Sequence, residues 1–260
     1  DRLTMGVLLR LDAQGAILSA DPCRSLIRSK ARLSYDQADA LLVGTLAACD
    51  LPCEDVWTQE VADTIRVLDE VAHLRQRIRH DRGAVDFTTR EAKVTLDGAG
   101  HPTGVVVRER TRATALIEEA MLMANESIAK MLADRDVPCA YRVHEQPSPE
   151  HLKAAMPILQ ELGLATGEAG KALVTGGPKA LQDVLAEAAG TPAEVLVNSL
   201  LLRAQKRAVY LPHNEGHYAL AARAYCHFTS PIRRYPDVLV HRALGALMAG
   251  TLDSAEAHKI

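Results

Sequence analysis

Aromatic residues are scarce in this sequence and make up only 3% of its 260 residues. No apolar run approaches the roughly 20 residues that a membrane-spanning helix needs. The opening residues, Asp1-Arg2-Leu3-Thr4, contain neither the core of a signal peptide nor an initiator methionine. We therefore expect no membrane partner, and we expect a fragment or a processed chain.

Paired cysteine spacings are also missing. The five cysteines are an odd number without a Cys-x-x-Cys motif, which argues against a disulfide framework and against a structural zinc site. A reducing, cytoplasmic location is the simplest interpretation. Cys49 and Cys53 have no matching Cys or His pair after them. With neither a zinc pattern nor a helix-turn-helix motif, no DNA partner is expected.

Other motifs for sites are incomplete. Residues 167–172 look like a phosphate loop, but Ala172 stands where that motif requires Ser or Thr. His213 and His217 have the i, i+4 spacing of a metal pair, but a proline and a glycine beside them favour a loop over a zinc-binding helix. The absence of a Gly-x-Ser-x-Gly elbow argues against a serine hydrolase.

The charge that is present is unevenly distributed. The formal net charge is −3, yet residues 203–235 contain six basic residues against the single acid Glu215. Residues 24–32 contain four basic residues and no acid. Because binding depends on local potential more than on the total charge, these segments indicate a track for a polyanion. The alternative is two solvated faces with unrelated partners.

Hydrophobic periodicity predicts an α/β fold, in which helices pack around a mixed or antiparallel sheet. Strands are expected in a hairpin over residues 3–20 and in a sheet segment between 84 and 108. Helices are expected over residues 35–46, 58–79 and 111–133, in a helical insert over 148–205, and from Pro231 to about Ala249.

The run from His227 to Asp237 predicts a helix start that holds a phosphate. Thr229 or Ser230 suits the N-cap, and Pro231 suits the first helical position. Arg233 and Arg234 would then lie in the first turn, where they oppose the helix dipole unless an anion is bound. The alternative is a capped helix whose arginines contact carboxylates of the protein itself.

A few side chains beside the basic segments are candidates for RNA contacts. Tyr35 follows the 24–32 segment and Phe87 follows a basic helix end, so each could stack on a base, although a core position is the commoner role. Glu118 and Glu119 point about 100° apart on one helix, so at most one of them faces a given site. That carboxylate could bind ribose hydroxyls; a solvated acidic face is the alternative.

Four sequence blocks together resemble the RNB catalytic domain of ribonuclease II and ribonuclease R. They occur in the order of that family, and the resemblance extends from about residue 1 to residue 250. The blocks are residues 28–35, 116–126, 141–145 and 227–237, the last followed by His241-Arg242.

The resemblance implies an RNB-type α/β domain that encloses a channel for single-stranded RNA. It implies hydrolytic, processive 3′-to-5′ exoribonuclease activity that releases nucleoside 5′-monophosphates with Mg²⁺ as cofactor. The 260 residues would then form most of one RNB domain, with residues 148–205 as a helical insert within it.

The resemblance also assigns roles to individual residues. Arg233 matches the arginine at the scissile phosphate and is the expected catalytic residue. Tyr35 matches an aromatic contact of the RNA channel, Phe87 one wall of the clamp on the 3′-terminal base, and Glu118 or Glu119 the contact to the terminal ribose. The full set expected to bind RNA is Tyr35, Phe87, Glu118, Glu119, Lys30, Ser230, Arg234 and His217.

The sequence departs from the family at the metal site. It lacks the aspartate block, with a spacing like Asp-x5-Asp-x-Asp-Asp, that binds two Mg²⁺ ions; Asp134 and Asp136 are its nearest imitation. In the family this block lies upstream of the opening hairpin, and an OB-fold module lies downstream. We therefore expect the Mg²⁺ ligands outside this fragment, which alone would be inactive. The alternative is an RNA-binding homologue that has lost catalysis and acts as a regulator.

Overall fold

The computed structural model describes residues 1–87, 91–108 and 110–252 and has a mixed α/β architecture. The chain forms two compact units. The first contains residues 1–84, 112–146 and 206–260, and the second contains residues 85–111 and 147–205. The named strands form antiparallel pairs, β1 with β2, β3 with β4 and β5 with β6. Among the described residues, no helix is long and apolar enough to cross a membrane.

A long antiparallel hairpin opens the first unit. Strand β1 spans Arg2–Leu11 and strand β2 spans Ile17–Ile27. Asp12 shapes the turn between them, because its Oδ1 accepts hydrogen bonds from the backbone N–H groups of Gln14 (2.9 Å) and Ala16 (2.8 Å). Gly15 has a φ of +84°, and a Cβ there would lie 2.8 Å from Cβ of Leu74. Glycine therefore allows this turn to pack directly against a helix.

Three helices follow in the first unit: α1 (Tyr35–Leu42), α2 (Thr58–Asp81) and α3 (Arg112–Ala133). Ser34 and Gln37 form a capping box at the start of α1, which satisfies backbone N–H groups that the helix leaves unpaired. The start of α3 is capped from α1, since the backbone N–H of Ala113 donates to Oδ1 of Asp39 (2.8 Å). The caps thus fix the ends of two helices and link α1 to α3.

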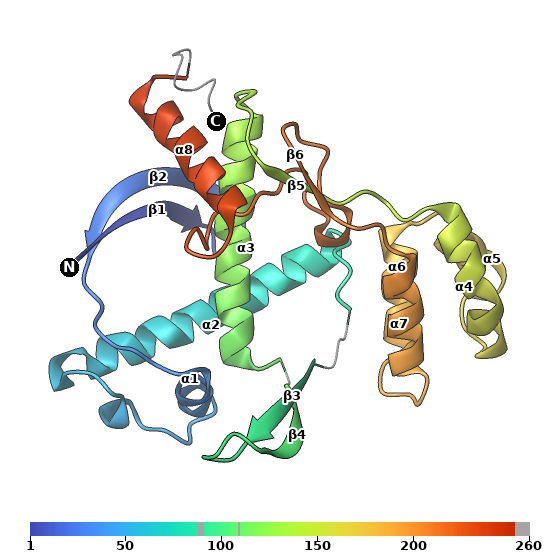
Figure 1. The fold of residues 1–260 in the computed structure, drawn as a ribbon, viewed down its shortest axis with the longest axis horizontal. Coiled ribbons are helices and arrows are strands. Elements are labelled where there is room, and N and C mark those ends of the chain that lie inside the picture. The colour runs from blue at the N-terminus through green and yellow to red at the C-terminus, as the bar shows by residue number, and fades with distance from the viewer. Residues whose placement is uncertain (88–90, 109, 253–260) are drawn as a thin grey trace. The chain divides into compact units, whose positions relative to one another are not determined.

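Helices α2 and α3 cross at the centre of the first unit (Figure 1). The buried face of α2 is not purely apolar, because Asp69, Arg75 and Arg79 are buried on it together with Ala62, Ile65 and Ala72. Charged groups are buried only at a cost unless they are paired. Helix α3 supplies the partners of Asp69 and Arg79, whereas Arg75 donates to the carbonyl of Gly15 in the β1–β2 turn.

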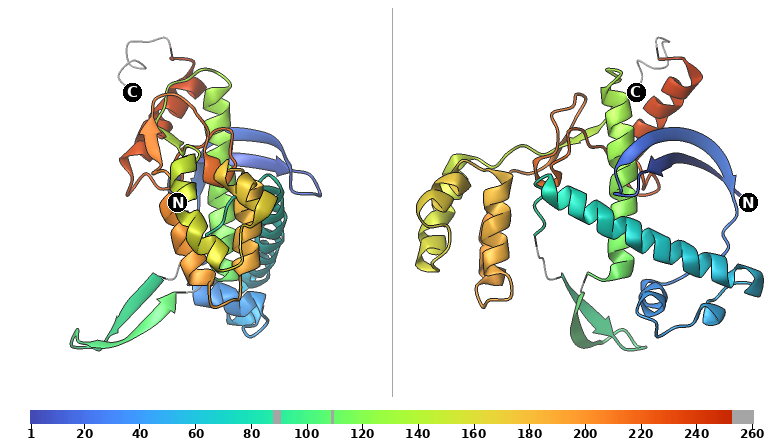
Figure 2. Two further views of the ribbon diagram at one scale, coloured as in Figure 1. Left: turned by 90° about the vertical axis from the view of Figure 1, so that its right-hand side faces the viewer. Right: turned by 180° about the vertical axis from the view of Figure 1, so that it is seen from behind.

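The C-terminal part of the first unit packs on the other end of α3. Strand β5 (Tyr141–Val143) pairs with β6 (Val209–Leu211), and helix α8 spans Tyr235–Ala249. One core joins these elements through fully buried side chains that include Ile128, Leu132, Val143, Val240 and Leu244. Seen from behind, the β1–β2 hairpin curves across α3 (Figure 2).

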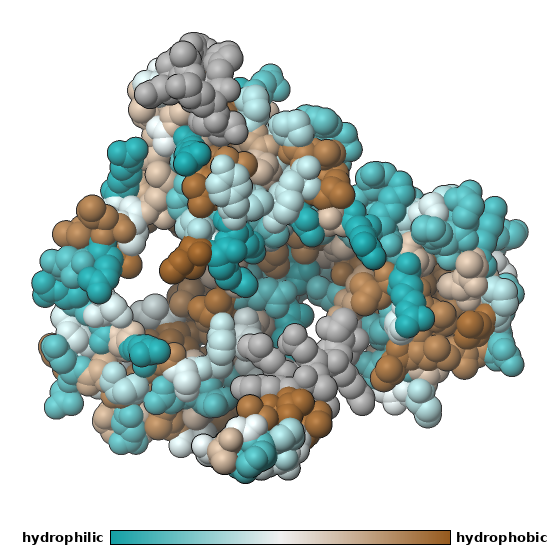
Figure 3. All heavy atoms as spheres, in the orientation of Figure 1, coloured by the Kyte–Doolittle hydropathy of each residue, from teal (hydrophilic) through white to brown (hydrophobic). Residues whose placement is uncertain are grey.

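The second unit has its own core and its own hairpin. Helices α4 (Pro149–Glu161), α5 (Gly167–Val174), α6 (Pro178–Ala188) and α7 (Glu194–Ala204) surround fully buried leucines at 152, 159, 173, 181 and 201. Strands β3 (Glu91–Leu96) and β4 (Pro102–Arg108) form the hairpin. Figure 3 shows apolar side chains on the molecular surface. On this hairpin Val94, Leu96 and Val105 are each more than half exposed.

The expected α/β class is confirmed, and several expected boundaries are corrected. The segment 148–205 is helical as expected and holds four helices, α4 to α7. Residues 85–87 are not a strand; Val85 instead joins the core of the second unit. The last helix begins at Tyr235 and not at Pro231.

Truncation of Leu132 tests the core of the first unit. Leu132 is 0% exposed on α3, so Leu132→Ala is expected to lower the free energy of unfolding by about 2–5 kcal/mol through lost burial and a cavity. Ile117→Ala, on the same helix but 40% exposed, should change it by less than about 1 kcal/mol. Urea unfolding followed by circular dichroism measures both, and equal losses would contradict the core assignment.

Candidate active site

The turn that precedes α8 differs from the expected phosphate-binding helix start. Residues 231–233 form a separate turn, in which the carbonyl of Ser230 accepts from the backbone N–H groups of Arg233 and Arg234, both at 3.2 Å. Arg234 is the N-cap of α8, and Pro236 lies in its first turn. The expectation that Pro231 opens the helix and that Thr229 or Ser230 caps it was therefore wrong, since Pro236 provides the helix-starting proline instead.

Asp237 holds this turn together. Its carboxylate is fully buried and accepts hydrogen bonds from the backbone N–H of Ser230 (2.7 Å) and from Nε and Nη2 of Arg234 (both 2.8 Å). An acidic residue in the first turn also complements the helix dipole. The anion that offsets the Arg234 cation is therefore a carboxylate of the protein itself, as the alternative interpretation of this segment allowed.

Arg233 differs from its neighbour in its surroundings. Its side chain is exposed, and it follows Ile232, which is 98% exposed. Within the part of the chain that the structure describes, its guanidinium makes no hydrogen bond or ion pair. Its backbone is nevertheless fixed by the bond to Ser230 and, through Ser230, by Asp237. The turn thus presents one arginine on a constrained backbone.

A cluster of rings lies beside this turn. The hydroxyl of Tyr210 and Nδ1 of His227 are 2.6 Å apart, and the guanidinium of Arg142 lies 4.7 Å from the centre of the Tyr210 ring. The Tyr225 ring meets both His227 and His217 edge-on, with centroid distances of 5.7 and 5.3 Å. Strands β5 and β6 therefore bring an arginine and a tyrosine next to residues of the 227–237 block.

Asn125 connects this cluster to the central helix α3. Its side-chain amide donates to the hydroxyl of Tyr225 (3.0 Å), and its carbonyl oxygen accepts from the backbone N–H of Phe228 (3.0 Å). Asn125 is only 3% exposed. One buried amide thus fixes the chain on both sides of His227.

The histidines of the cluster are neutral at neutral pH. Burial, with nearby His144 and Arg142, lowers the pKa of His217 to about 3. Burial, with the cation of Arg234, lowers the pKa of His227 to about 4. The positive charge of this region therefore comes from arginines, because neutral imidazoles carry none.

The candidate RNA contacts Tyr35 and Lys30 lie elsewhere in the first unit. Tyr35 begins α1 and is 45% exposed, so part of its ring is open to a base. The ammonium of Lys30 lies 3.1 Å from the ring centroid of Trp57, a cation–π contact between residues far apart in the sequence. Lys30 and Tyr35 are therefore both exposed.

The two adjacent glutamates of α3 occupy different environments. Glu119 is 1% exposed, and its Oε1 accepts from Nη2 (2.9 Å) and Nε (3.2 Å) of the buried Arg79. Glu118 is half-buried. As the helical geometry required, only one of the pair faces outward, and Glu119 serves an internal ion pair.

Phe87 belongs to the second unit. It is partly buried and packs against the helical core formed by α4 to α7. Its role as one wall of a base clamp stays a prediction.

The described residues provide no metal site: no group of three or more His, Cys, Asp or Glu side chains is arranged to hold an ion. Asp134 is paired with Lys130, and His213 with Glu215. The side chains that the structure describes therefore do not fit Mg²⁺.

Several residues of the candidate site were missed from the sequence. Asp237 and His227 stand inside the recognised 227–237 block, and Arg142 inside the 141–145 block, so the blocks themselves were the available signal. Tyr210 lies in no block, and only the scarcity of aromatics could have drawn attention to it. Asn125 stands inside the 116–126 block, but only the fold shows that its amide is buried and binds Tyr225 and Phe228.

The fold and these sequence blocks define the class of the protein. The sequence matches the RNB domain family over residues 1–250, and the chain belongs to this family. The particular relatives it resembles include ribonuclease R of Aquifex aeolicus, which is 39% identical over 250 residues, covering 96% of this chain and 34% of the relative. Ribonuclease R of Escherichia coli is 32% identical over 252 residues, covering 96% of this chain and 29% of the relative. The chain spans about a third of the length of these relatives.

Solved structures agree with this assignment. Mycoplasma genitalium RNase R in complex with ribose-methylated single-stranded RNA matches with a TM-score of 0.82 and 28% identity, over 94% of this chain and 37% of that one. Yeast Ssd1, described as a pseudonuclease, matches with a TM-score of 0.66 and 22% identity, over 96% of this chain and 29% of that one. The second likeness concerns the fold alone.

Substitution of Asp237 tests the turn. Asp237→Asn removes the charge that pairs with Arg234, and it is expected to lower the free energy of unfolding by about 3–5 kcal/mol, because the half-buried guanidinium loses its partner. Asp63→Asn, which breaks an exposed pair with Arg66, should cost less than about 1 kcal/mol. Chemical unfolding measures both. A small effect at Asp237 would show that the turn does not depend on this carboxylate.

The pKa of His217 predicts a pH dependence of stability. Between about pH 6.5 and about pH 3 the unfolded chain binds a proton at this histidine that the folded chain does not. Stability is therefore fully present above about pH 6.5 and is lost as the pH falls, by about 2 kcal/mol at about pH 5. His217→Asn should remove this part of the loss, whereas His151→Asn, at an exposed site on α4, should not. Chemical unfolding at about pH 7.5 and about pH 5 measures the loss in the free energy of unfolding between the two pH values. An equal loss in both variants would contradict the assignment.

Proposed function

We propose that the protein carrying this chain is a hydrolytic 3′-to-5′ exoribonuclease that degrades single-stranded RNA to nucleoside 5′-monophosphates. The observation that carries the proposal is the RNB match over residues 1–250 together with ribonuclease R relatives that align with almost the whole chain. The M. genitalium RNase R that this chain resembles binds single-stranded RNA. This supports RNA, and not DNA, as the substrate.

Arg233 is the catalytic residue in this proposal. In hydrolysis of the terminal phosphodiester, a water oxygen attacks phosphorus and the 3′-oxygen of the preceding nucleotide leaves, so negative charge accumulates on the phosphoryl oxygens. A guanidinium on a fixed backbone stabilises that charge without reorganising, which is worth several kcal/mol. Arg233 has the exposed side chain and constrained turn that this role requires.

Arg234 has a different role in the proposal. Its Nε and Nη2 are both used by Asp237, so it orients the turn and adds positive potential beside the phosphate path. Ser230 contributes its backbone to the same turn, and the neutral His217 lies in the adjacent ring cluster. We propose that these three residues position the RNA end and Arg233, and do not transfer protons.

The remaining RNA contacts involve the exposed Tyr35 and Lys30 and the half-buried Glu118. Tyr35 stacks on a base, with Lys30 near a phosphate, and Glu118 rather than the buried Glu119 binds the terminal ribose. Phe87 forms a wall of the clamp on the last base. A 2′-hydroxyl at the Glu118 contact would distinguish RNA from DNA.

Two further parts of the proposal concern the setting of the reaction. The reaction depends on Mg²⁺, whose ligands we expect outside these 260 residues, so that the isolated chain would be inactive. The protein acts in the cytoplasm, as its unpaired cysteine pattern suggests.

A catalytically inactive RNA-binding regulator is the second candidate function. It is favoured by one observation, that yeast Ssd1, a pseudonuclease, shares the fold. The two functions predict different behaviour of the intact protein: an enzyme shortens RNA with turnover, whereas a regulator binds it unchanged. An aspartate block beside this chain in the full protein would favour the enzyme.

Digestion of RNA labelled at its 5′ end tests the proposed function. The intact protein with Mg²⁺ should produce a ladder that shortens stepwise from the 3′ side, and a matched DNA should persist. Arg233→Ala should slow the reaction by about 100-fold or more, since a preorganised cation at a phosphoryl group contributes several kcal/mol.

Arg66→Ala provides the matched control, because this exposed arginine of α2 lies outside both basic segments and outside the expected set of RNA contacts. Its rate should remain within about twofold of the unmodified protein. If RNA is bound but never shortened, the regulator is the correct assignment. If Arg233→Ala degrades RNA at the normal rate, the role given to Arg233 is wrong.

A further inference from the structure

The helices of the second unit leave a groove at one end, with a volume of about 390 Å³. It is lined by the chain that follows α4, by the end of α6 with the turn after it, and by the start of α7. All of it lies within one compact unit. Six of its eight lining residues are apolar, and we call the feature that they form the α4–α7 groove: Leu162, Leu164, Ala188, Pro192, Ala193 and Leu196.

Part of the apolar lining of the α4–α7 groove is open to solvent. Leu162 and Leu196 are 40% and 45% exposed, and Val195 beside them in the sequence is 55% exposed. Leu164 and Ala188 are buried and belong to the helical core, so the groove reaches the edge of that core. Its volume is within the range of ligand pockets, about 300–1,000 Å³. Exposed apolar side chains grouped at a groove are typical of a surface that binds another protein.

Carboxylates border the same groove, and no cation of the chain accompanies them. Glu187 lines the groove, whereas Glu161 and Glu194 are each next in sequence to a lining residue. Within the part of the chain that the structure describes, none of the three forms an ion pair, and the ion pairs of α5 and α6 join other residues. The two bordering segments, residues 158–168 and 184–196, contain no Lys, Arg or His. The local potential at this end of the unit is therefore negative.

Two of these glutamates occupy unfavourable positions in their helices. The C-terminal end of a helix carries partial negative charge and prefers a basic residue in its last turn. The last turns of α4 and α6 instead contain Glu161 and Glu187, and neither turn contains a base. Glu194, in the first turn of α7, is favourably placed. A departure from a local rule that no contact of the described chain offsets indicates a functional surface, and cations of a partner would offset it.

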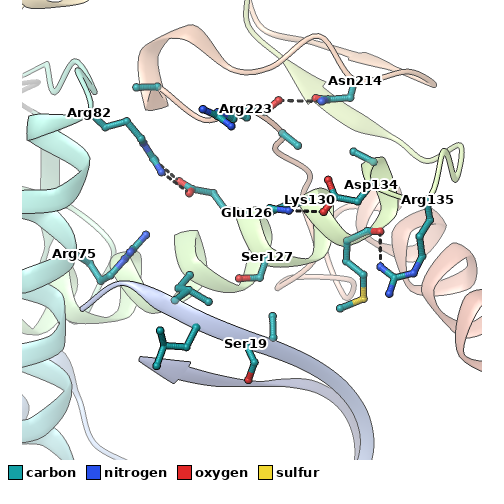
Figure 4. Close-up of a pocket in the computed structure, with 17 residues that line it drawn as sticks. Ser19, Arg75, Arg82, Glu126, Ser127, Lys130, Asp134, Arg135, Asn214 and Arg223 are labelled. Atoms are coloured by element: carbon teal, nitrogen blue, oxygen red, sulfur yellow. Dashed lines mark hydrogen bonds and ion pairs between the residues drawn. The ribbon is translucent and has the colours of Figure 1, made fainter. Parts of the chain in front are cut away.

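The large cavity of the first unit has the opposite arrangement. It lies between β2, α2, α3 and the 214–224 segment and has a volume of about 640 Å³. Its two acidic lining residues are both paired with lining bases, Glu126 with Arg82 (2.8 Å) and Asp134 with Lys130 (Figure 4). The carboxylates of that cavity are thus neutralised by the protein itself, whereas those at the α4–α7 groove are not.

We propose that the α4–α7 groove binds a basic amphipathic helix of a protein partner. The apolar residues of that helix, at positions i, i+3, i+4 and i+7, lie on Leu162 and Leu196. Its Lys or Arg side chains lie near Glu161, Glu187 and Glu194. RNA and anionic membranes are not the occupants, because the carboxylates repel their phosphates. This inference is independent of the hydrolytic function proposed above.

Binding of a labelled synthetic peptide to the intact protein tests the proposal. The peptide is an amphipathic helix of about 18 residues, with Leu at positions i, i+3, i+4 and i+7 and Lys on the other face. Fluorescence anisotropy measures its dissociation constant. Leu196→Ala should raise this constant about tenfold, because an apolar anchor of the groove is lost. The matched control is Leu202→Ala, at 43% exposure on the same helix but not in the lining, which should change the constant by less than about twofold.

The glutamates are tested by removing their charge while their shape is kept. Glu161→Gln combined with Glu187→Gln should raise the dissociation constant about fivefold or more and should make binding less sensitive to salt. The same double variant should keep or raise the melting temperature, because it removes unfavourable charges from two helix ends, so weaker binding does not reflect unfolding. Glu54→Gln combined with Glu70→Gln removes the same charge at exposed positions of the first unit and should change the constant by less than about twofold.

Four results would overturn the proposal. The first is equal peptide binding by a groove variant and its control, and the second is equally tight binding of a peptide with Glu in place of Lys. The third is no saturable binding at about 100 µM, which would mean that another part of the polypeptide covers the groove. The fourth is weaker binding of single-stranded RNA by Leu196→Ala, which would make the groove an RNA contact. RNA degradation by the intact protein decides the proposed function separately, and Leu196→Ala should leave its rate unchanged.

Discussion

The first unit depends on the pairing of charges where α2 crosses α3. Arg79 and Glu119 are both almost fully buried and bind each other, and Asp69 on α2 is likewise buried against Arg112 on α3. A buried charge is tolerated only with a partner in good geometry, so these pairs allow few registers of one helix on the other. The apolar residues of α2 and α3 alone would permit more registers, because apolar contacts have no direction.

Asn125 connects α3, and with it the α2–α3 register, to the candidate site. This residue is about two turns beyond Glu119 on α3, and its amide holds both Tyr225 and the backbone of Phe228. From Phe228 the chain continues into the turn that Asp237 closes. The guanidinium of Arg233 is therefore exposed, whereas its backbone is held by a series of buried polar contacts that connects it to the α2–α3 crossing. Such support allows an exposed arginine to be preorganised.

Membership of the RNB family does not by itself decide activity. The same architecture occurs in ribonuclease R and in a yeast pseudonuclease, so the chemistry is determined by particular side chains and not by the fold. In this chain the two arginines of one turn already differ, because Arg234 is bound by Asp237 and Arg233 is exposed. Arg233 and Arg234 both belong to the 227–237 block, and only the contacts of their side chains distinguish them.

The sequence by itself determined the class and most elements. Apolar runs on either side of a turn located β1 and β2, helical patterns located α2 and α3, and the four blocks indicated the RNB domain, because these signals are local or depend on order along the chain. It also predicted that Glu118 and Glu119 would face different ways, from helix geometry alone. It did not locate the start of α8, because Pro231 and Pro236 both satisfy the local rule.

Only the tertiary structure decided which charges are internal. Asp69, Arg75, Arg79, Glu119 and Asp237 are indistinguishable in the sequence from solvated residues, and each is buried with contacts to residues distant in the chain or, for Asp237, one helical turn away. The same holds for the cavity, whose wall combines residues from β2, α2, α3 and the 214–224 segment. Burial and long-range pairing are properties of the packed chain, so no local pattern encodes them.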